Sequence, residues 1–349
     1  MSSPMLGISI GDPNGIGPEV VLKTFSDSRM FDFCTPIVYA HPDFLASQNK
    51  HFGLKVPLHT LNDRPQRRAL NVVSSWDTTP QVAYGQETKT AGKFALQSLT
   101  AATAALKEGT IQALVTAPIN KASIQSEAFD FPGHTDYLAQ ALGGEALMFM
   151  IHDQLRVGLL TDHVAISEVS SLFTQDRIVN KLRLMSESLR QDFGIRKPKI
   201  AVLGINPHAG DNGVIGSEDM NILAPTLANQ NTENTLLFGP FSADAFFGSQ
   251  SYLDYDAVLA AYHDQGLVPF KTLSFGEGVN YTAGLSAVRT SPDHGTAFSI
   301  AGKGIADHRS FQQAVFAALD IMRKRQEFEE LSADSLPLQG DKKRTKRDN

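Results

Sequence analysis

The feature that most constrains the fold of this chain is a regular alternation of short apolar runs with longer segments of helical periodicity. Six apolar runs of about five residues predict buried strands, because each ends at a polar, glycine or proline position. They are Leu6–Ile10, Ile37–Ala40, Ala113–Thr116, Val157–Thr161, Ile200–Ile205 and Ala257–Ala261. Between them, the periodicity predicts amphipathic helices at Gly17–Phe25, Ala91–Glu108, Ser167–Phe193 and Glu218–Asn229. This alternation predicts an α/β fold with a largely parallel sheet.

The length and composition of the chain narrow its organisation and its cellular setting. Its 349 residues are enough to bury a sizeable core and to form one large or two moderate domains. The single cysteine, Cys34, excludes an intramolecular disulfide and favours a reducing compartment. No apolar run approaches the ~20 residues that a membrane helix needs, and the first residues do not resemble a signal peptide. We therefore expect a cytoplasmic protein, and the net charge of −6 argues against nucleic acid as its main partner.

A glycine-containing loop follows the first predicted strand. Its sequence, GDPNGIGPE, places glycines at positions 11, 15 and 17 and a proline at the start of the predicted helix. Glycines permit a tight turn, and the N-terminus of a helix can hold an anionic group. The same pattern is as typical of a strand-to-helix turn that binds nothing. The spacing differs from G-x-G-x-x-G, so a Rossmann dinucleotide site is not predicted.

Three histidines, His163, His208 and His263, come directly after predicted strands. Neutral imidazole binds transition metals, and three protein ligands leave the open position that a catalytic metal site needs. A carboxylate that can orient the ring or complete the ligand set stands close to each one in sequence: Asp162, Asp211 and Asp264. A local hydrogen bond in a loop explains any one of these histidines more simply. Three at strand ends make a shared metal site credible, although the sequence does not show that they converge.

Two cationic residues, Lys271 and Arg289, lie in a segment rich in glycine, proline and polar residues between positions 256 and 303. Arginine binds a phosphate or a carboxylate through two parallel hydrogen bonds, and lysine supplies a compact charge. Asn280 adds a neutral amide between them. Most lysines and arginines are simply solvated, but a long irregular stretch in a compact enzyme often carries function. We therefore expect this segment to bind an acidic substrate.

Six motifs, in order along the chain, together resemble the 4-hydroxythreonine-4-phosphate dehydrogenase family. They run from about residue 5 to about residue 312, and six ordered motifs are far more specific than one glycine loop. The motifs are Gly11–Glu19, Thr116–Lys121, Gly133–Thr135, Asn206–Gly210, Tyr262–Gly266 and Arg289–Ala297. Two departures are Asn14, where a small residue is expected, and Asp211-Asn212, which stands in place of a more usual Glu-Gly.

The resemblance implies an enzyme of pyridoxal 5′-phosphate biosynthesis. Members oxidise 4-phosphooxy-L-threonine with NAD or NADP to 2-amino-3-oxo-4-phosphooxybutanoate, which decarboxylates to 3-amino-2-oxopropyl phosphate. They depend on a divalent metal, for which we expect zinc first, with magnesium, cobalt and manganese as the alternatives. Two other functions stay open. One is a dehydrogenase acting on threonate or erythronate 4-phosphate, and the other is a zinc hydrolase that uses the same histidines to activate water.

The resemblance also implies an architecture. The family fold is like that of isocitrate and isopropylmalate dehydrogenases, with two α/β lobes, a cleft between them and a homodimer whose active site lies at the interface. We expect residues 1–130 and 285–330 to form a nucleotide-binding lobe and residues 131–284 to form a metal- and substrate-binding lobe. Residues 331–349 are expected to form a flexible basic tail.

Individual residues take their roles from the same resemblance. His163, His208 and His263 match the metal ligands, contributed from both subunits. Asp244 and Asp264 match acidic residues that maintain the site, and they are our candidates for the catalytic base. The substrate-binding positions are His134, Thr135, Lys271, Asn280 and Arg289. In the relatives the late segment wraps the adenosine part of the nucleotide, which implies the cofactor-binding residues His294, Gly295, Thr296, Ala297 and Gly302.

Overall fold

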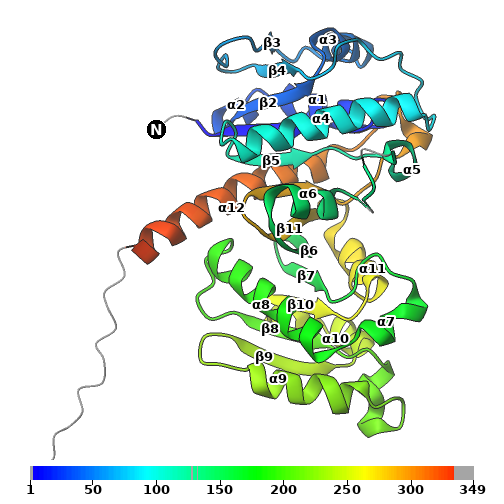
Figure 1. Ribbon diagram of the computed structural model, residues 1–349, viewed down its shortest axis with the longest axis vertical. Coiled ribbons are helices and arrows are strands. Elements are labelled where there is room, and N and C mark those ends of the chain that lie inside the picture. The colour runs from blue at the N-terminus through cyan, green and yellow to red at the C-terminus, as the bar shows by residue number, and fades with distance from the viewer. Residues whose placement is uncertain (1–2, 127–128, 132, 334–349) are drawn as a thin grey trace, which may run out of the picture.

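A single twisted sheet runs through both lobes of the protein (Figure 1). The computed structural model describes residues 3–126, 129–131 and 133–333. Within these residues the sheet has twelve strands in the order β3-β4-β2-β1-β5-β12-β11-β6-β7-β10-β8-β9. The strands are β1 (Met5–Ser9), β2 (Thr35–Ala40), β3 (Leu58–Thr60), β4 (Leu70–Ser74), β5 (Ala113–Thr116), β6 (Gly144–His152), β7 (Leu155–Leu159), β8 (Lys199–Leu203), β9 (Leu236–Phe241), β10 (Ala257–Ala260), β11 (Val279–Leu285) and β12 (Val288–Pro292).

Two parallel groups of strands meet at an antiparallel centre. The group from β3 to β12 is parallel, and so is the group formed by β7, β10, β8 and β9. Between them β11 pairs antiparallel with both β12 and β6, and β6 pairs antiparallel with β7. Three reversals leave the two parallel groups running in opposite directions. The central strands β6 and β11 therefore form the floor on which loops from both groups meet.

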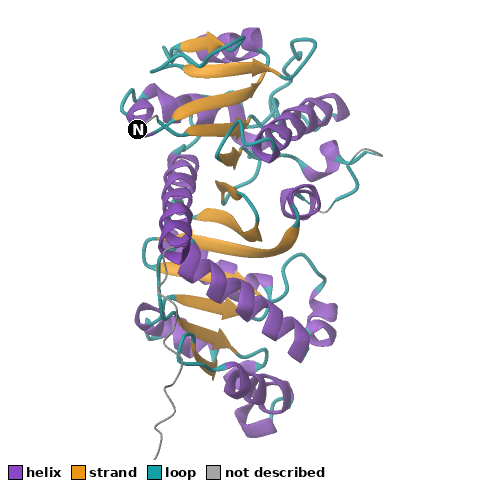
Figure 2. Ribbon diagram, turned by 60° about the vertical axis from the view of Figure 1, so that its left-hand side comes forward, coloured by secondary structure: helices purple, strands orange, loops and turns teal. Residues whose placement is uncertain are grey.

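Helices cover both faces of this sheet (Figure 2). The α-helices are α1 (Gly17–Ser26), α2 (Met30–Phe33), α3 (Pro42–His51), α4 (Lys89–Lys107), α5 (Lys121–Ile124), α6 (His134–Leu142), α7 (Ile166–Leu172), α8 (Gln175–Gln191), α9 (Ala224–Gln230), α10 (Ala243–Gly248), α11 (His263–Ser274) and α12 (Arg309–Ala333). Four shorter turns are η1 (Pro207–Gly213), η2 (Asp219–Leu223), η3 (Ser251–Asp254) and η4 (Phe298–Ile300). None of the helices in the described ranges is long and apolar enough to cross a membrane.

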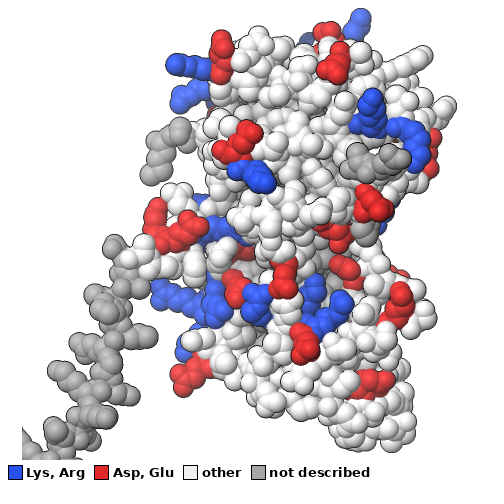
Figure 3. Space-filling model, in the orientation of Figure 1, with Lys and Arg blue, Asp and Glu red and all other residues white. Residues whose placement is uncertain are grey.

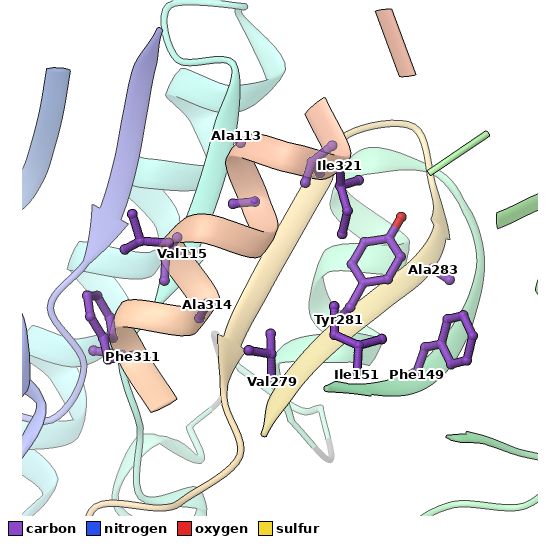
Figure 4. Packing of buried hydrophobic residues seen from close by; sticks show 14 of the residues in the cluster. Ala113, Val115, Phe149, Ile151, Val279, Tyr281, Ala283, Phe311, Ala314 and Ile321 are labelled. Atoms are coloured by element: carbon purple, nitrogen blue, oxygen red, sulfur yellow. The ribbon is translucent and has the colours of Figure 1, made fainter. Parts of the chain in front are cut away.

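The core beneath the central strands is built from one face of β11 and from α12. Tyr281 is fully buried, and it shares its face of β11 with Val279 and Ala283 because alternate residues of a strand point the same way. Phe311 and Ile321 of α12 belong to the same cluster (Figure 4). The opposite face of β11 is thereby left for the residues of the site described below.

A buried ionic network joins α8, β11 and α12. Arg325 on α12 donates from Nε to Oδ1 of Asp192 at 2.7 Å and from Nη2 to the hydroxyl of Tyr281 at 2.9 Å. Tyr281 and Ser188 both donate to Oδ2 of Asp192, at 2.5 and 2.6 Å. Burial raises the pKa of Tyr281 well above its usual range, and Asp192 adds to this effect. Tyr281 is therefore a neutral hydroxyl donor, and the network fixes β11 against α12.

The sequence predicted the buried strands of the parallel groups well. All six predicted strands are confirmed, with ends within two residues of those observed, and the sheet is largely parallel as expected. The predicted helix Ser167–Phe193 is instead two helices, α7 and α8, because the Thr174 side chain caps a new helix by accepting from the backbone of Arg177. The predicted helix Glu218–Asn229 begins with the π-helical turn η2 before α9.

Two further expectations need correction or qualification. The segment 256–303 is not a long irregular stretch, since it holds β10, α11, β11 and β12. Residues 331–333 of the predicted tail are helical, because α12 continues to Ala333, and the rest of the predicted tail, residues 334–349, lies outside the described part. The predicted lobe boundaries at 130 and 285 stay a prediction.

Candidate active site

A cavity of about 260 Å³ lies over β6 and β11, between the loops of the two parallel groups. Its wall includes Thr116 of β5, Arg289 of β12 and Lys271 of α11, and its floor includes Met148 and Met150 of β6. Nine residues that the sequence assigned to a site line it together: His134, Thr135, His163, His263, Lys271, Asn280, Arg289, His294 and Gly295. The predicted substrate positions therefore share one cavity, although they are 155 residues apart at the extremes (134 to 289).

Arg289 is the most unusual group in this cavity. It is 2% exposed, and among the described residues its guanidinium donates to two threonine hydroxyls, from Nε to Thr116 at 3.1 Å and from Nη1 to Thr282 at 3.0 Å. In the described part of the chain no carboxylate pairs with it. Burial lowers the pKa of Arg289 to about 9, so the group still carries its charge near neutral pH. A buried, unneutralised cation of this kind is suited to an anionic group of a bound molecule.

Three polar atoms of the cavity are buried without a hydrogen-bond partner among the described residues. They are Nε2 of His134, Oδ1 of Asn280 and Nε2 of His294. Burial holds the pKa of His134 well below its usual range, and the charges of Arg289 and Lys121 lower it further. His134 is therefore a neutral imidazole. Buried polar atoms are rarely left without a partner, so these three atoms are available to a polar ligand.

His163 and His263 lie side by side at one end of the cavity. Their ring centroids are 5.7 Å apart, and each follows the carboxyl end of its strand, β7 or β10. Nδ1 of His263 contacts Oδ1 of Asp264 at 2.7 Å, which fixes the ring and leaves Nε2 for another partner. Burial lowers the pKa of His163, with Lys121 adding to the effect. Two imidazoles in this arrangement fit a shared divalent metal.

His208 does not line this cavity. It is exposed on the turn η1, where it lies near Asp244 of α10. Asp244 accepts a hydrogen bond from Ser242 at 2.5 Å, and this bond is the main reason for the lowered pKa of Asp244, with His208 contributing. Within residues 3–126, 129–131 and 133–333 no three histidine, cysteine or acidic side chains gather around one point. The predicted three-histidine site is therefore not complete within one chain, and Asp244 stands with His208 rather than with the other pair.

The segment predicted to bind the cofactor packs on the N-terminal glycine loop and on α1. The backbone N–H of Ile16 donates to the carbonyl of Thr296 at 3.0 Å. Gly302 has φ +75°, and a Cβ there would lie 2.5 Å from the ring of Tyr84. Lys23 of α1 donates to the carbonyl oxygens of Gly304 and Ala306 at 3.0 and 2.8 Å. Thr296, Ala297 and Gly302 lie outside the cavity lining, while His294 and Gly295 belong to it.

The sequence missed several residues of the cavity. Lys121 and Thr116 belong to one of the motifs that carry the resemblance, but neither the charge of Lys121 nor the hydroxyl of Thr116 was assigned a role. Lys271, which the sequence did predict, donates from Nζ to the backbone carbonyl of Asp293 at 2.8 Å, and this bond anchors it at the rim. The floor residues Met148 and Met150 carried no signal, because both read as ordinary core residues of an apolar run.

The fold and the cavity together define a class of protein. It is an α/β protein with a cavity that is lined by histidines and by cationic side chains, a lining suited to an anionic small molecule. The family described as "Pyridoxal phosphate biosynthetic protein PdxA" matches residues 32–318 of the sequence. The chain belongs to this family.

Named relatives agree with this assignment. A 4-hydroxythreonine-4-phosphate dehydrogenase of Bacteroides thetaiotaomicron is 45% identical over 325 residues, which are 92% of this chain and 89% of the relative. The enzyme of the same name from Prosthecochloris aestuarii is 40% identical over 91% of this chain and 97% of its own length. The crystal structure of 4-hydroxythreonine-4-phosphate dehydrogenase from Klebsiella pneumoniae superposes with a TM-score of 0.79 at 32% identity, over 92% of this chain and 100% of that one. The α/β fold is thereby confirmed.

Proposed function

We propose that this protein is a 4-hydroxythreonine-4-phosphate dehydrogenase of pyridoxal 5′-phosphate biosynthesis. It oxidises the 3-hydroxyl of 4-phosphooxy-L-threonine with NAD(P), and the resulting 2-amino-3-oxo-4-phosphooxybutanoate loses CO2 to give 3-amino-2-oxopropyl phosphate. The observation that carries the proposal is the buried guanidinium of Arg289, which has no described carboxylate partner and stands beside three unpartnered polar atoms in one cavity. The names of the relatives support the same reaction.

The cavity residues bind and orient the substrate in this proposal. Arg289 and Lys271 hold its anionic groups, and His134, Thr135 and Asn280 supply neutral hydrogen-bonding groups. Two fixed cations and several directional bonds restrict the substrate to one orientation, which lowers the entropy cost of reaching the transition state. Asp264, held at 2.7 Å from His263, or Asp244 receives the hydroxyl proton.

A dehydrogenase of this family requires a divalent metal and a nicotinamide dinucleotide. His163, His208 and His263 would hold the metal, zinc in first place, and the metal supplies Lewis acidity at the reacting oxygen. His294, Gly295, Thr296, Ala297 and Gly302 would hold NAD or NADP, which accepts the hydride. The contact of Asp264 with His263 and the short separation of the His163 and His263 rings, 5.7 Å between centroids, suit metal binding.

The enzyme is proposed to act as a homodimer with a site built by both chains. Large apolar side chains are exposed close to each predicted ligand in sequence: Ile166 near His163, Val214 near His208 and Val268 near His263. Val214 is 80% exposed and Ile166 72%, and burying such side chains against another chain would favour association. A partner that packs against them would complete the ligand set that one chain leaves open.

A spectrophotometric assay at 340 nm tests the function. The purified protein receives Zn²⁺ and NAD⁺ or NADP⁺ together with 4-phosphooxy-L-threonine, threonate 4-phosphate or erythronate 4-phosphate. Reduction with the amino acid, lost on chelation, is the expected result. A preference for threonate or erythronate 4-phosphate would keep the chemistry and reassign the substrate. No reduction with any of the three, in a protein shown to hold metal, would favour a zinc hydrolase instead.

A further inference from the structure

The turn that carries His208 has an unfavourable backbone conformation. Six consecutive residues have positive φ angles: His208 (53°), Ala209 (49°), Gly210 (83°), Asp211 (42°), Asn212 (53°) and Gly213 (92°). Residues with a Cβ rarely adopt this region of φ. Of the four such residues in the turn, Asp211 and Asn212 are of the types that adopt it most readily. A run of this length persists only where surrounding groups hold it in place.

The carboxylate of Asp219 is the group that holds the start of this turn. Its Oδ1 accepts from the backbone N–H of Ile205 at 2.8 Å, and its Oδ2 accepts from the backbone and side-chain nitrogens of Asn206 at 3.1 and 3.0 Å. Asp219 is fully buried, and in the described part of the chain no lysine or arginine pairs with it. Its hydrogen-bond donors among the described residues are these three N–H groups.

Close packing leaves the turn little room to relax. A Cβ on Gly204 would lie 2.9 Å from both Oδ1 of Asp219 and Cα of Ala209. A Cβ on Gly210 would lie 2.9 Å from the carbonyl of Gly216. The carboxylate of Asp219 therefore packs against the end of β8 and against the turn residues with positive φ. A shift of this carboxylate would move the backbone of the turn.

A second side chain ties this turn to the loop of His263. Gln265 accepts from the backbone N–H of Ala261 at 2.7 Å and donates to the carbonyl of Gly204 at 2.7 Å. The ends of β8 and β10 are therefore locked together, so that the His208 turn and the His263 loop share one frame. Within that frame Asp219 is the only charged group that contacts the backbone leading into the turn among the described residues.

We propose that Asp219 is a positioning residue of the metal site, which holds the left-handed turn so that His208 is presented as a ligand. The inference rests on the proposed function for the role of His208, and it adds a residue to which the resemblance gave no role. Asp219 does not touch the metal or the substrate. It acts through the backbone of Ile205 and Asn206.

The substitution Asp219→Asn tests this role with little change in shape. The carboxylate accepts from three donors, so an amide in its place turns an NH2 group toward at least one N–H and pushes the turn away. Loss of a residue that orients a metal ligand weakens metal binding roughly 10- to 100-fold. We expect a loss of this size for Asp219→Asn.

Glu218→Gln is the matched control. It removes a charge one residue earlier. The half-buried Glu218 side chain accepts from Nδ2 of Asn206 at 2.9 Å and from the hydroxyl of Ser170 at 3.4 Å. No backbone N–H of the turn depends on it. Its affinity for metal should stay within about twofold of the wild type, a difference well below the loss expected for an orienting residue.

The experiment titrates Co²⁺ into the metal-free full-length protein and follows the visible absorption of the bound ion. Wild type, His208→Ala, Asp219→Asn and Glu218→Gln are compared, and circular dichroism establishes that each is folded. If His208→Ala and Asp219→Asn both lose affinity while Glu218→Gln does not, the inference holds. If His208→Ala loses affinity and Asp219→Asn binds like the wild type, the inference fails and the proposed function stands. If His208→Ala binds like the wild type, the metal assignment itself is wrong and the inference fails with it.

Two further variants keep the test decisive if Asp219→Asn does not fold. Asn206→Ala removes one of the three donors and leaves the backbone bonds, so it should weaken Co²⁺ binding less than Asp219→Asn but measurably. Ala209→Gly, combined with Asp219→Asn, should restore part of the affinity because glycine adopts a positive φ freely. Wild-type affinity in Asn206→Ala, or no rescue by glycine in a folded double variant, would contradict the proposed role.

Discussion

Replacing Arg289 by methionine should separate the activity of this protein from its stability. Lowering the pKa of Arg289 from 12.5 to about 9 corresponds to roughly 5 kcal/mol of unfavourable burial of the charge. Its three hydrogen bonds to Thr116 and Thr282 return about 1 kcal/mol each. The net effect of the substitution is a gain of about 2 kcal/mol in the free energy of unfolding, or a few degrees in Tm.

The same substitution removes the anchor for an anionic group of the substrate. Two charge-assisted hydrogen bonds are worth about 1.5–3 kcal/mol each, so kcat/KM should fall by about 10²- to 10⁴-fold. Differential scanning calorimetry and the 340 nm assay measure the two effects on one preparation. Arg156→Met is the control, since Arg156 is a largely buried arginine outside the cavity whose guanidinium carbon lies 4.8 Å from the ring centroid of Phe193. The turnover of this variant should stay near that of the wild type. An Arg289→Met protein that melts several degrees lower and keeps its kcat/KM would refute the reasoning.

Three other substitutions follow from the same contacts. Arg325→Met should lower the free energy of unfolding by about 3–5 kcal/mol, because it leaves the buried Asp192 unpaired. A calorimetric Tm at or above that of the wild type would contradict this prediction. The pKa of His134 is lower in the folded than in the unfolded state, so the unfolded state binds more protons below about pH 6.5. The protein should therefore lose stability as the pH falls. Between pH 8 and pH 5 the Tm of His134→Gln should fall less than that of the wild type. Gly302→Val should raise the KM for NAD(P) at least tenfold (~1.4 kcal/mol), because the Cβ of the new valine collides with the ring of Tyr84. Substrate binding, measured calorimetrically without the dinucleotide, should stay unchanged.

The parallel groups of the sheet could be predicted from the sequence because their strands are buried on both faces. Ala113–Thr116 and Ala257–Ala260 are short apolar runs that end at polar residues, a pattern that a strand shows wherever helices cover both sides of a sheet. The central strands could not be predicted in the same way. The apolar run of β6 is of the same kind, with Met148 and Met150 toward the cavity and Phe149 toward the core, but nothing in it indicates that the strand runs antiparallel to its neighbours.

The candidate site was predictable as a set of motifs and not as a geometry. The sequence pointed to His134, Asn280 and Arg289, and the structure brings them into one cavity. It could not indicate that His208 stands apart from His163 and His263, since the position of a turn depends on long-range contacts such as those of Asp219. The burial of Arg289 was equally hidden, because only the fold shows that two threonines are its hydrogen-bonding partners.

The most direct test of the proposed reaction follows the hydrogen on C3 of the substrate. 4-Phosphooxy-L-threonine deuterated at C3 is incubated with the metal-loaded protein and NAD(P)⁺, and the reduced dinucleotide is analysed by mass spectrometry. The proposed oxidation transfers that deuterium to the nicotinamide ring, one per CO2 released, and chelation of the metal abolishes the transfer. Deuterium that remains in the phosphorylated product or appears in water, with no labelled NAD(P)H, would contradict the proposed function.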